Sequence, residues 1–228
     1  MQQFVVSIVI PAYNEEKTIG NVISETILAM DGLGVPYEII VVDDGSTDET
    51  KMIASRYKAM VLSNGRNRGK GYALRKGFKH AQGDVIVTMD ADGSHKPKEI
   101  SDLINPLFNG VDITAGSRFL GHGKQSITKL NRFGNFMFNT TITVLTGKRV
   151  TDSQSGFRAF KREVLESFNL ESLGYSIETE ITVKGLKNGF VFQEKPITCE
   201  KRKYDVSKLR TFADGKKILK TILKSKFV

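Results

Sequence analysis

Two carboxylates separated by one residue follow a short, mostly apolar run. Residues 85–89 end on Asp90 and Asp92. A run of this length between turn residues predicts a buried strand. Carboxylates at i and i+2 on an extended exit can share one hard divalent cation such as Mg²⁺ or Mn²⁺, which prefers oxygen ligands and commonly keeps a phosphate as a partner. Because Asp-x-Asp alone is common by chance, a solvated turn is the competing interpretation of this stretch.

Acidic residues also follow two other predicted strands. Glu15 comes after the strand at residues 4–10, and Asp43 and Asp44 come after the strand at residues 37–42. In a parallel sheet these exits share the carboxyl edge, where open α/β sheets bind ligands. Like charges gathered at one edge repel each other, so the arrangement is unfavourable unless a cation and a ligand are recruited. The pattern therefore predicts a ligand site at this edge.

The elements that must position these acids alternate along the chain. This alternation predicts an α/β fold with one Rossmann-like, mostly parallel central sheet and helices on both faces. Asn14 is expected to cap the first helix, and Ser46 with Glu49 to form a capping box for the second. The expected strands are 4–10, 37–42, 59–62, 85–89 and 111–115, and the expected helices are 15–30, 48–57, 72–81 and 97–108.

Composition and charge narrow the class of protein. The 228 residues suit one large domain, and the single cysteine, Cys199, rules out an internal disulfide framework. No secretory signal is expected, and no apolar stretch is long enough to predict a transmembrane helix. The net charge is +9, and residues 195–228 hold eleven basic against three acidic residues. Such a basic end favours an anionic partner: a membrane surface, nucleic acid or a phosphorylated substrate.

Two common phosphate-binding motifs are absent from the expected places. The first strand is followed by Pro-Ala-Tyr-Asn-Glu-Glu at residues 11–16 rather than by G-x-G-x-x-G. Residues 67–72, Asn-Arg-Gly-Lys-Gly-Tyr, lack the spacing and the Lys-Ser/Thr ending of a P-loop. These departures argue against a dinucleotide-binding domain and a P-loop nucleotidase.

Several short stretches together resemble the family 2 glycosyltransferases of the GT-A fold. They follow the family's order over residues 4–210, and the closest likeness is to polyprenyl-phosphate hexosyltransferases. Residues 175–181 and 202–209 carry that closer likeness, and the chain has no tryptophan for the Gln-x-x-Arg-Trp motif of polymerising synthases. The other stretches are IVIPAYNEE at 8–16, VVDDGSTD at 41–48, NRGKGYA at 67–73, MDADG at 89–93, GSR at 116–118 and DSQSGFR at 152–158.

The resemblance implies a nucleotide-sugar site with Mg²⁺ or Mn²⁺. Asp90, Asp92 and Ser94 would hold the metal, although mannose synthases often have Gln where Ser94 stands. The Asp-Ala-Asp-Gly form also resembles the glucosyl branch, so the donor stays open between GDP-mannose and UDP-glucose or UDP-N-acetylglucosamine. The residues implied to bind the nucleotide sugar are Pro11, Tyr13, Glu15, Asp43, Asp44, Lys70, Asp90, Ala91 and Asp92.

The implied acceptor is a polyprenyl (dolichyl) phosphate. Its phosphate calls for cations, and Arg118, Arg132, Arg202 and Lys208 are the candidates. The expected catalytic residues are Asp92, Arg118 and Asp152. Asp152 either touches the sugar or acceptor, or caps a turn. Arg158 is expected to pair with a nearby acid, Glu178 and Glu180 to begin a helix, and His80, His95 and His122 to be surface or packing residues.

Two segments have an amphipathic pattern. Residues 127–147 predict one long helix or a helix pair, either near the acceptor or packed in the core. Residues 211–228 predict a basic helix beyond a domain at 1–210, with Ile218, Leu219, Ile222, Leu223 and Phe227 on one face. We expect this helix to attach the protein peripherally to the cytoplasmic face of a membrane, with docking on the domain as the alternative.

Two other functions compete with this interpretation. A family 2 enzyme could use a glycan or protein acceptor instead of a lipid. A non-enzymatic protein could bind nucleic acid through the basic end, but that leaves the acids at three strand exits unexplained. We therefore expect no nucleic-acid partner.

Overall fold

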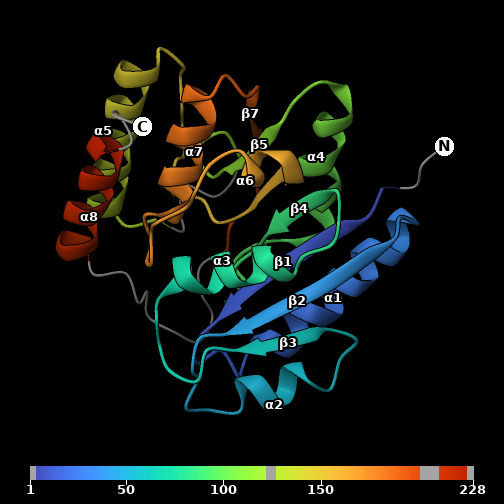
Figure 1. Ribbon diagram of the computed structural model, residues 1–228. Coiled ribbons are helices and arrows are strands. Elements are labelled where there is room, and N and C mark those ends of the chain that lie inside the picture. The colour runs from blue at the N-terminus through green and yellow to red at the C-terminus, as the bar shows by residue number, and fades with distance from the viewer. Residues whose placement is uncertain (1–3, 122–126, 201–210, 225–228) are drawn as a thin grey trace.

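In the computed structural model, which describes residues 4–121, 127–200 and 211–224, seven strands form one sheet in the order β3-β2-β1-β4-β6-β5-β7 (Figure 1). Only β6 runs against its neighbours β4 and β5; the other pairs are parallel. This confirms the predicted α/β class. The strands are β1 Val6–Ala12, β2 Tyr37–Asp43, β3 Met60–Ser63, β4 Val85–Thr88, β5 Ile113–Ser117, β6 Arg158–Lys161 and β7 Phe192–Pro196.

Helices pack on both faces of the sheet. Along β1, Ile8 and Ile10 belong to a core shared with α1 and α4, whereas Val9 belongs to a second core shared with α3 and α7. Alternate residues of a strand point to opposite faces, so one apolar run supplies both cores. The helices are α1 Ile19–Leu33, α2 Thr50–Ala54, α3 Lys70–His80, α4 Ile100–Ile104, α5 Lys129–Thr146, α6 Arg162–Glu166, α7 Ile177–Lys187 and α8 Thr211–Lys224, with 3-10 turns at Pro97–Glu99 and Asn105–Asn109.

The expected caps of the first two helices are wrong. Helix α1 begins at Ile19, and Asn14 instead has a positive φ of 53° and accepts a hydrogen bond from the Thr47 backbone. Ser46 accepts from the Asn14 backbone, and no side chain caps α2, which is shorter than the expected 48–57 helix. These polar residues tie the loops after β1 and β2 to each other, a long-range role that a local capping pattern does not reveal.

Two other departures also have local causes. The expected helix at 97–108 is broken into α4 and two 3-10 turns, with Pro106 near the start of the second. Proline lacks the N–H that would continue the helix. Strands β6 and β7 were not predicted, because β6 is only four residues long and β7 mixes polar with apolar residues.

Helices α5 and α8 lie side by side at one end of the molecule (Figure 1). The 127–147 pattern is thus one long helix. On α8, Ile218 and Ile222 are buried in a cluster with Ile142 and Val183, so this part of its apolar face docks on the protein, while Phe227 lies outside the described residues. Across the described part of the chain, no helix is long and apolar enough to cross a bilayer.

Candidate active site

A cleft of about 710 Å³ opens where β1, β2 and β4 end. The parallel register brings these strand exits together, as expected for the carboxyl edge of such a sheet. Arg68, Leu173, Tyr175 and Lys217 also line it and were not predicted. Eight predicted residues line the cleft: Pro11, Tyr13, Glu15, Asp44, Lys70, Asp90, Ala91 and Asp92.

The two aspartates at the end of β2, Asp43 and Asp44, accept hydrogen bonds that hold the neighbouring loops in place. Asp43 is buried outside the cleft lining and accepts from the Ser46 backbone and the Ser63 hydroxyl. Asp44 lines the cleft and accepts from the Arg68 and Gly69 backbone N–H groups at 3.0 and 2.7 Å. Asp43 therefore holds the loop that begins after β2, and Asp44, on the cleft side, holds the backbone at the start of α3.

Asp90 and Asp92 lie in the turn that follows β4, and Ser94 and His95 come next in the sequence. The Ser94 backbone donates to Asp92 Oδ1 at 2.9 Å, and Ser94 and Asp92 are both buried. His95 was expected to be a surface or packing residue. It does pack, because its ring stacks on Phe157. Its Nδ1 also accepts a hydrogen bond from the Asp90 backbone N–H at 3.3 Å. The pKa of His95 is lowered, because the effect of burial is larger than the opposing effect of the nearby Asp90 and Asp92 carboxylates.

The oxygen atoms at this turn suit a metal ion whose remaining coordination positions are filled by a bound ligand. Within residues 4–121, 127–200 and 211–224, no three acidic, histidine or cysteine side chains form a metal-binding group. Two carboxylates and the Ser94 hydroxyl are the hard donors at the turn. Mg²⁺ typically binds through one or two carboxylates plus substrate phosphates rather than in an all-protein cage.

Lys70 lies between two carboxylates from distant parts of the chain. Its Nζ is 2.6 Å from Asp90 Oδ1 and 2.6 Å from Glu178 Oε1. Burial alone would lower the pKa of Lys70, but Asp90 and Glu178 more than offset this and raise it. Lys70 is therefore a permanent cation in the cleft. Glu178 and Glu180 lie in the first turn of α7, as predicted.

Three glycines make this placement possible. A Cβ on Gly69 or Gly71 would lie 2.4 Å from the Leu173 or Ser172 carbonyl oxygen, so α3 can begin against that loop only with glycine there. A Cβ on Gly156 would lie 2.7 Å from Lys70 Nζ and 2.8 Å from Asp90 Oδ1. The Asn-Arg-Gly-Lys-Gly and Asp-Ser-Gln-Ser-Gly motifs therefore meet around one ion pair.

Arg118 and Asp152, both predicted as catalytic, bind each other. Arg118 donates from Nε to Asp152 Oδ2 at 2.7 Å and from Nη2 to Oδ1 at 2.8 Å. Asp152 is fully buried, and neither residue lines the cleft. Burial would lower the pKa of Arg118, but Asp152 raises it overall. Arg132 is exposed on α5, and Arg202 and Lys208 lie outside the described residues.

Contrary to expectation, Arg158 forms no ion pair with an acid among the residues that the structure describes. It is buried and donates to the Ser153, Ser155 and Glu178 carbonyl oxygens and to the Thr182 hydroxyl. It therefore fastens the segment that holds Asp152 and Gly156 to helix α7. The sequence gives no signal for this role, because all four partners depend on the tertiary structure.

Comparison with known proteins gives a consistent result. The family profile described as Glycosyl transferase family 2 matches residues 7–168. A dolichol-phosphate mannosyltransferase from Pyrococcus furiosus is 38% identical over 213 residues, which are 90% of this chain and 59% of that protein. A polyprenol monophosphomannose synthase from Mycolicibacterium smegmatis is 34% identical over 215 residues, covering 89% of this chain and 80% of that protein.

A solved structure shares the fold over nearly the whole chain. Glucosyl-3-phosphoglycerate synthase from Mycobacterium tuberculosis, in complex with Mn²⁺, UDP and phosphoglyceric acid, superposes with a TM-score of 0.80 at 25% identity. The match covers 99% of this chain and 79% of that one. The family profile, the two curated relatives and this fold agree with the motifs at the strand exits. The chain belongs to glycosyl transferase family 2 and is a glycosyltransferase.

Proposed function

We propose that this enzyme transfers a hexose from a nucleotide sugar to a polyprenyl (dolichyl) phosphate at a membrane surface, with Mg²⁺ or Mn²⁺. The carboxylate pair after β4, on the lining of the 710 Å³ cleft, carries the proposal. Two relatives named for dolichol and polyprenol acceptors support the lipid. The synthase complexed with phosphoglyceric acid supports the alternative, a small phosphorylated acceptor. The two acceptors share a phosphate but differ in whether a lipid surface is needed.

The donor lies in the cleft in this proposal. Tyr13, Glu15 and Asp44 contact the nucleoside, with Pro11 and Ala91 shaping the walls. Asp90, Asp92 and Ser94 hold the metal, which supplies positive charge for the departing nucleoside diphosphate. Asp43 supports this site from beneath, through the loop that it holds.

The acceptor phosphate needs cations more than it needs a base. Phosphate monoesters have a second pKa of about 6, so the acceptor phosphate, which is the nucleophile, is mostly a dianion at neutral pH. Asp152 uses two of the five N–H groups of Arg118, which leaves three for a phosphate. Asp152 therefore acts by orienting Arg118. Arg132, Arg202 and Lys208 stay candidates for the same phosphate.

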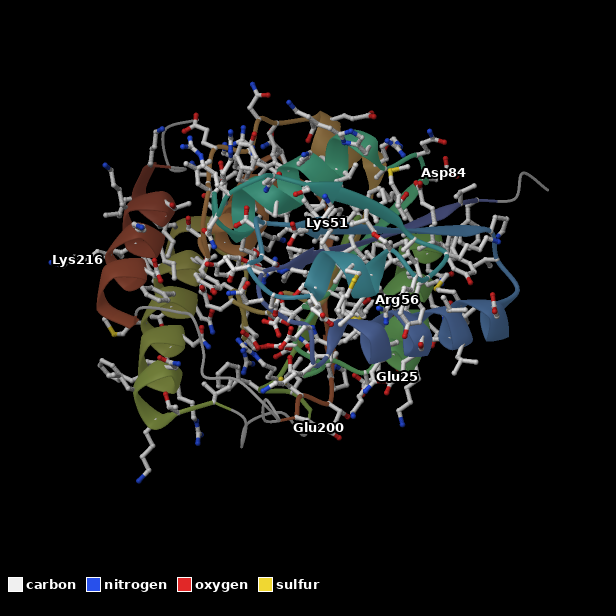
Figure 2. The ribbon with its side chains drawn as sticks, turned by 90° about the horizontal axis from the view of Figure 1, so that it is seen from below. Glu25, Lys51, Arg56, Asp84, Glu200 and Lys216 are labelled. Atoms are coloured by element: carbon white, nitrogen blue, oxygen red, sulfur yellow. The ribbon has the colours of Figure 1, made fainter. Side chains whose placement is uncertain are left out.

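A lipid acceptor needs a surface that meets the bilayer, and the α5–α8 end offers one. Among the exposed apolar residues of α5 are Phe133 at 64% and Phe136 at 65%, and Arg132, next to Phe133 in the sequence, is also exposed. On α8, Leu219 and Leu223 are exposed among lysines, and Lys216 points away from the body in Figure 2. Basic residues interleaved with large apolar ones suit an anionic membrane interface. We propose peripheral attachment there, on the cytoplasmic face.

Helix α8 also reaches the cleft. Asp214 and Lys217, in its first two turns, line the donor cleft, while Ile218 and Ile222 bind it to the protein. The outer face carries Lys216, Lys220 and Lys224. In this proposal, the membrane surface lies beside the cleft mouth, and the lipid-linked phosphate enters there.

A transfer assay tests the function. The purified chain would receive radiolabelled GDP-mannose, UDP-glucose or UDP-N-acetylglucosamine with Mn²⁺, and either polyprenyl phosphate in liposomes or 3-phosphoglycerate. Labelled lipid from one donor is expected. Labelled phosphoglycerate without labelled lipid would replace the proposal with the alternative, and no product from any pair would overturn both.

A further inference from the structure

Lys70 is shared equally by two carboxylates that have different surroundings. Asp90 lines the cleft beside Asp92, and its side chain is 24% exposed. Glu178 comes from helix α7, and its side chain is only 4% exposed. Both carboxylates lie 2.6 Å from Lys70 Nζ. Asp90 can therefore meet a ligand in the cleft, whereas Glu178 can serve only as an internal partner.

The backbone on either side of Lys70 is fixed. The Asp44 carboxylate accepts from the Gly69 N–H at 2.7 Å, and the Tyr72 N–H donates to the Leu173 carbonyl at 3.1 Å. The loop at Leu173 is held in turn by Glu180, which accepts from the Glu171 and Ser172 backbone. The backbone of Lys70 is thus held at a place from which its side chain reaches both carboxylates. What can change is how the Lys70 ammonium group divides its contacts between Asp90 and Glu178.

A divalent cation on Asp90 would compete with this lysine. Two cations on one carboxylate repel each other, and in a partly buried site the repulsion is screened less than in water. Glu178 reduces the cost, since it can hold Lys70 as Asp90 turns to the metal. A nucleoside diphosphate reduces it further by bringing negative charge. Lys70 therefore weakens the attraction of these carboxylates for the metal alone, and the negative charge of the nucleotide offsets that loss.

Resting on the metal site of the proposed function, we propose that Lys70 and Glu178 regulate the metal affinity of Asp90. Lys70 keeps the metal weakly bound until a nucleoside diphosphate is present, and Glu178 is the carboxylate that holds Lys70 when Asp90 contacts the metal. Lys70 is thus a positioning residue that couples metal and nucleotide binding. Such coupling is reciprocal: the factor by which the nucleotide tightens the metal equals the factor by which the metal tightens the nucleotide.

Mn²⁺ binding measured by electron paramagnetic resonance tests this without an activity assay. The full chain would be titrated with Mn²⁺ alone and with saturating UDP or GDP, as wild type, Lys70→Met and Glu178→Gln. Without nucleotide, we expect Lys70→Met to tighten Mn²⁺ binding about tenfold. Glu178→Gln should weaken it about three- to tenfold, because Asp90 is then the remaining carboxylate partner of Lys70 among the described residues.

Matched variants separate this effect from a change in net charge. Lys79→Met removes a cation from the exposed end of the same helix, and Glu166→Gln removes an exposed acid of α6; neither should change Mn²⁺ affinity. Damage to the fold would weaken binding in both site variants, whereas the proposal requires opposite signs. Thermal unfolding of each variant checks that the chain is folded.

The outcomes distinguish the inference from the function on which it rests. Wild type that binds Mn²⁺ with nucleotide, together with a Lys70→Met variant that binds Mn²⁺ no more tightly, would overturn the role of Lys70 alone. Wild type that binds no Mn²⁺ even with UDP or GDP would instead remove the metal site of the proposed function. A smaller nucleotide effect on Mn²⁺ affinity in Lys70→Met than in wild type would support the coupling.

Discussion

The cleft and the α5–α8 end differ in whether their side chains already have partners within the protein. In the cleft, charged groups are paired before any ligand arrives: Lys70 with Asp90, and Asp44 with the start of α3. At the α5–α8 end, large apolar side chains such as Phe133 and Phe136 are left exposed. Preorganised polar groups bind a charged donor with little reorganisation, whereas exposed apolar side chains await a partner surface. In the proposed function, the donor accordingly binds in the cleft and the lipid binds at the helical end.

The largest expected effect comes from the cleft. Asp92→Asn removes one of two carboxylates from the proposed metal site, and a metal contributes several kcal/mol to stabilising transition-state charge. We therefore expect transfer to fall by at least about 1,000-fold, measured as labelled product per minute at saturating donor. Asp102→Asn, in an exposed acid of α4, is the control and should stay near wild type. A variant with Asp92→Asn that keeps full activity would contradict the assignment.

Within the helical end, burial should separate two neighbouring residues. Ile222 is fully buried in the cluster with Ile142 and Val183, so Ile222→Ala should cost about 2–5 kcal/mol of unfolding free energy. Leu223 is 48% exposed, and Leu223→Ala should change stability by less than about 0.5 kcal/mol. Urea denaturation of both variants measures the difference. Equal costs would mean that α8 does not dock as described.

The exposed face of the same end should matter for lipid and not for stability. Replacing Phe133 and Phe136 with Asp should reduce flotation with anionic liposomes about tenfold or more, because buried apolar area supports interfacial binding. Leu28→Asp, on α1 and 72% exposed, is the matched control and should float like wild type. Unchanged flotation of the double variant would remove α5 from the proposed membrane surface.

The smallest effect is a pH dependence of stability at His95, which is buried against the turn that carries Asp90. His95 is buried with a lowered pKa, so the unfolded chain binds a proton below its ordinary value of about 6.5 before the folded chain does. Stability is therefore full above about pH 6.5 and falls as the pH drops toward the lowered pKa.

Melting curves at about pH 7.5 and 5.5 should show a loss of up to about 1.4 kcal/mol from this group. The loss should shrink in His95→Gln and persist in His80→Gln, whose histidine is exposed on α3. An equal loss in all three proteins would show that His95 titrates normally.

The sequence predicted the cleft better than it predicted the helical end. Residues 37–42 and 85–89 were recognised as strands because apolar runs next to turn residues are local signals, and their exits lie at the cleft as expected. The pairing of Lys70 with Glu178 could not be predicted, since the two residues are far apart in sequence and meet only through α3 and α7. For α8, periodicity identified one apolar face but could not divide it into buried Ile218 and exposed Leu219.

Anomalous scattering from manganese, in crystals grown with Mn²⁺ and UDP or GDP, would locate the metal relative to Asp90 and Asp92. We expect one strong peak within coordination distance of the Asp90 and Asp92 carboxylates, with the diphosphate oxygens completing the coordination shell. Nucleotide bound in the cleft with no manganese between these two carboxylates, or manganese bound only at some other place, would contradict it.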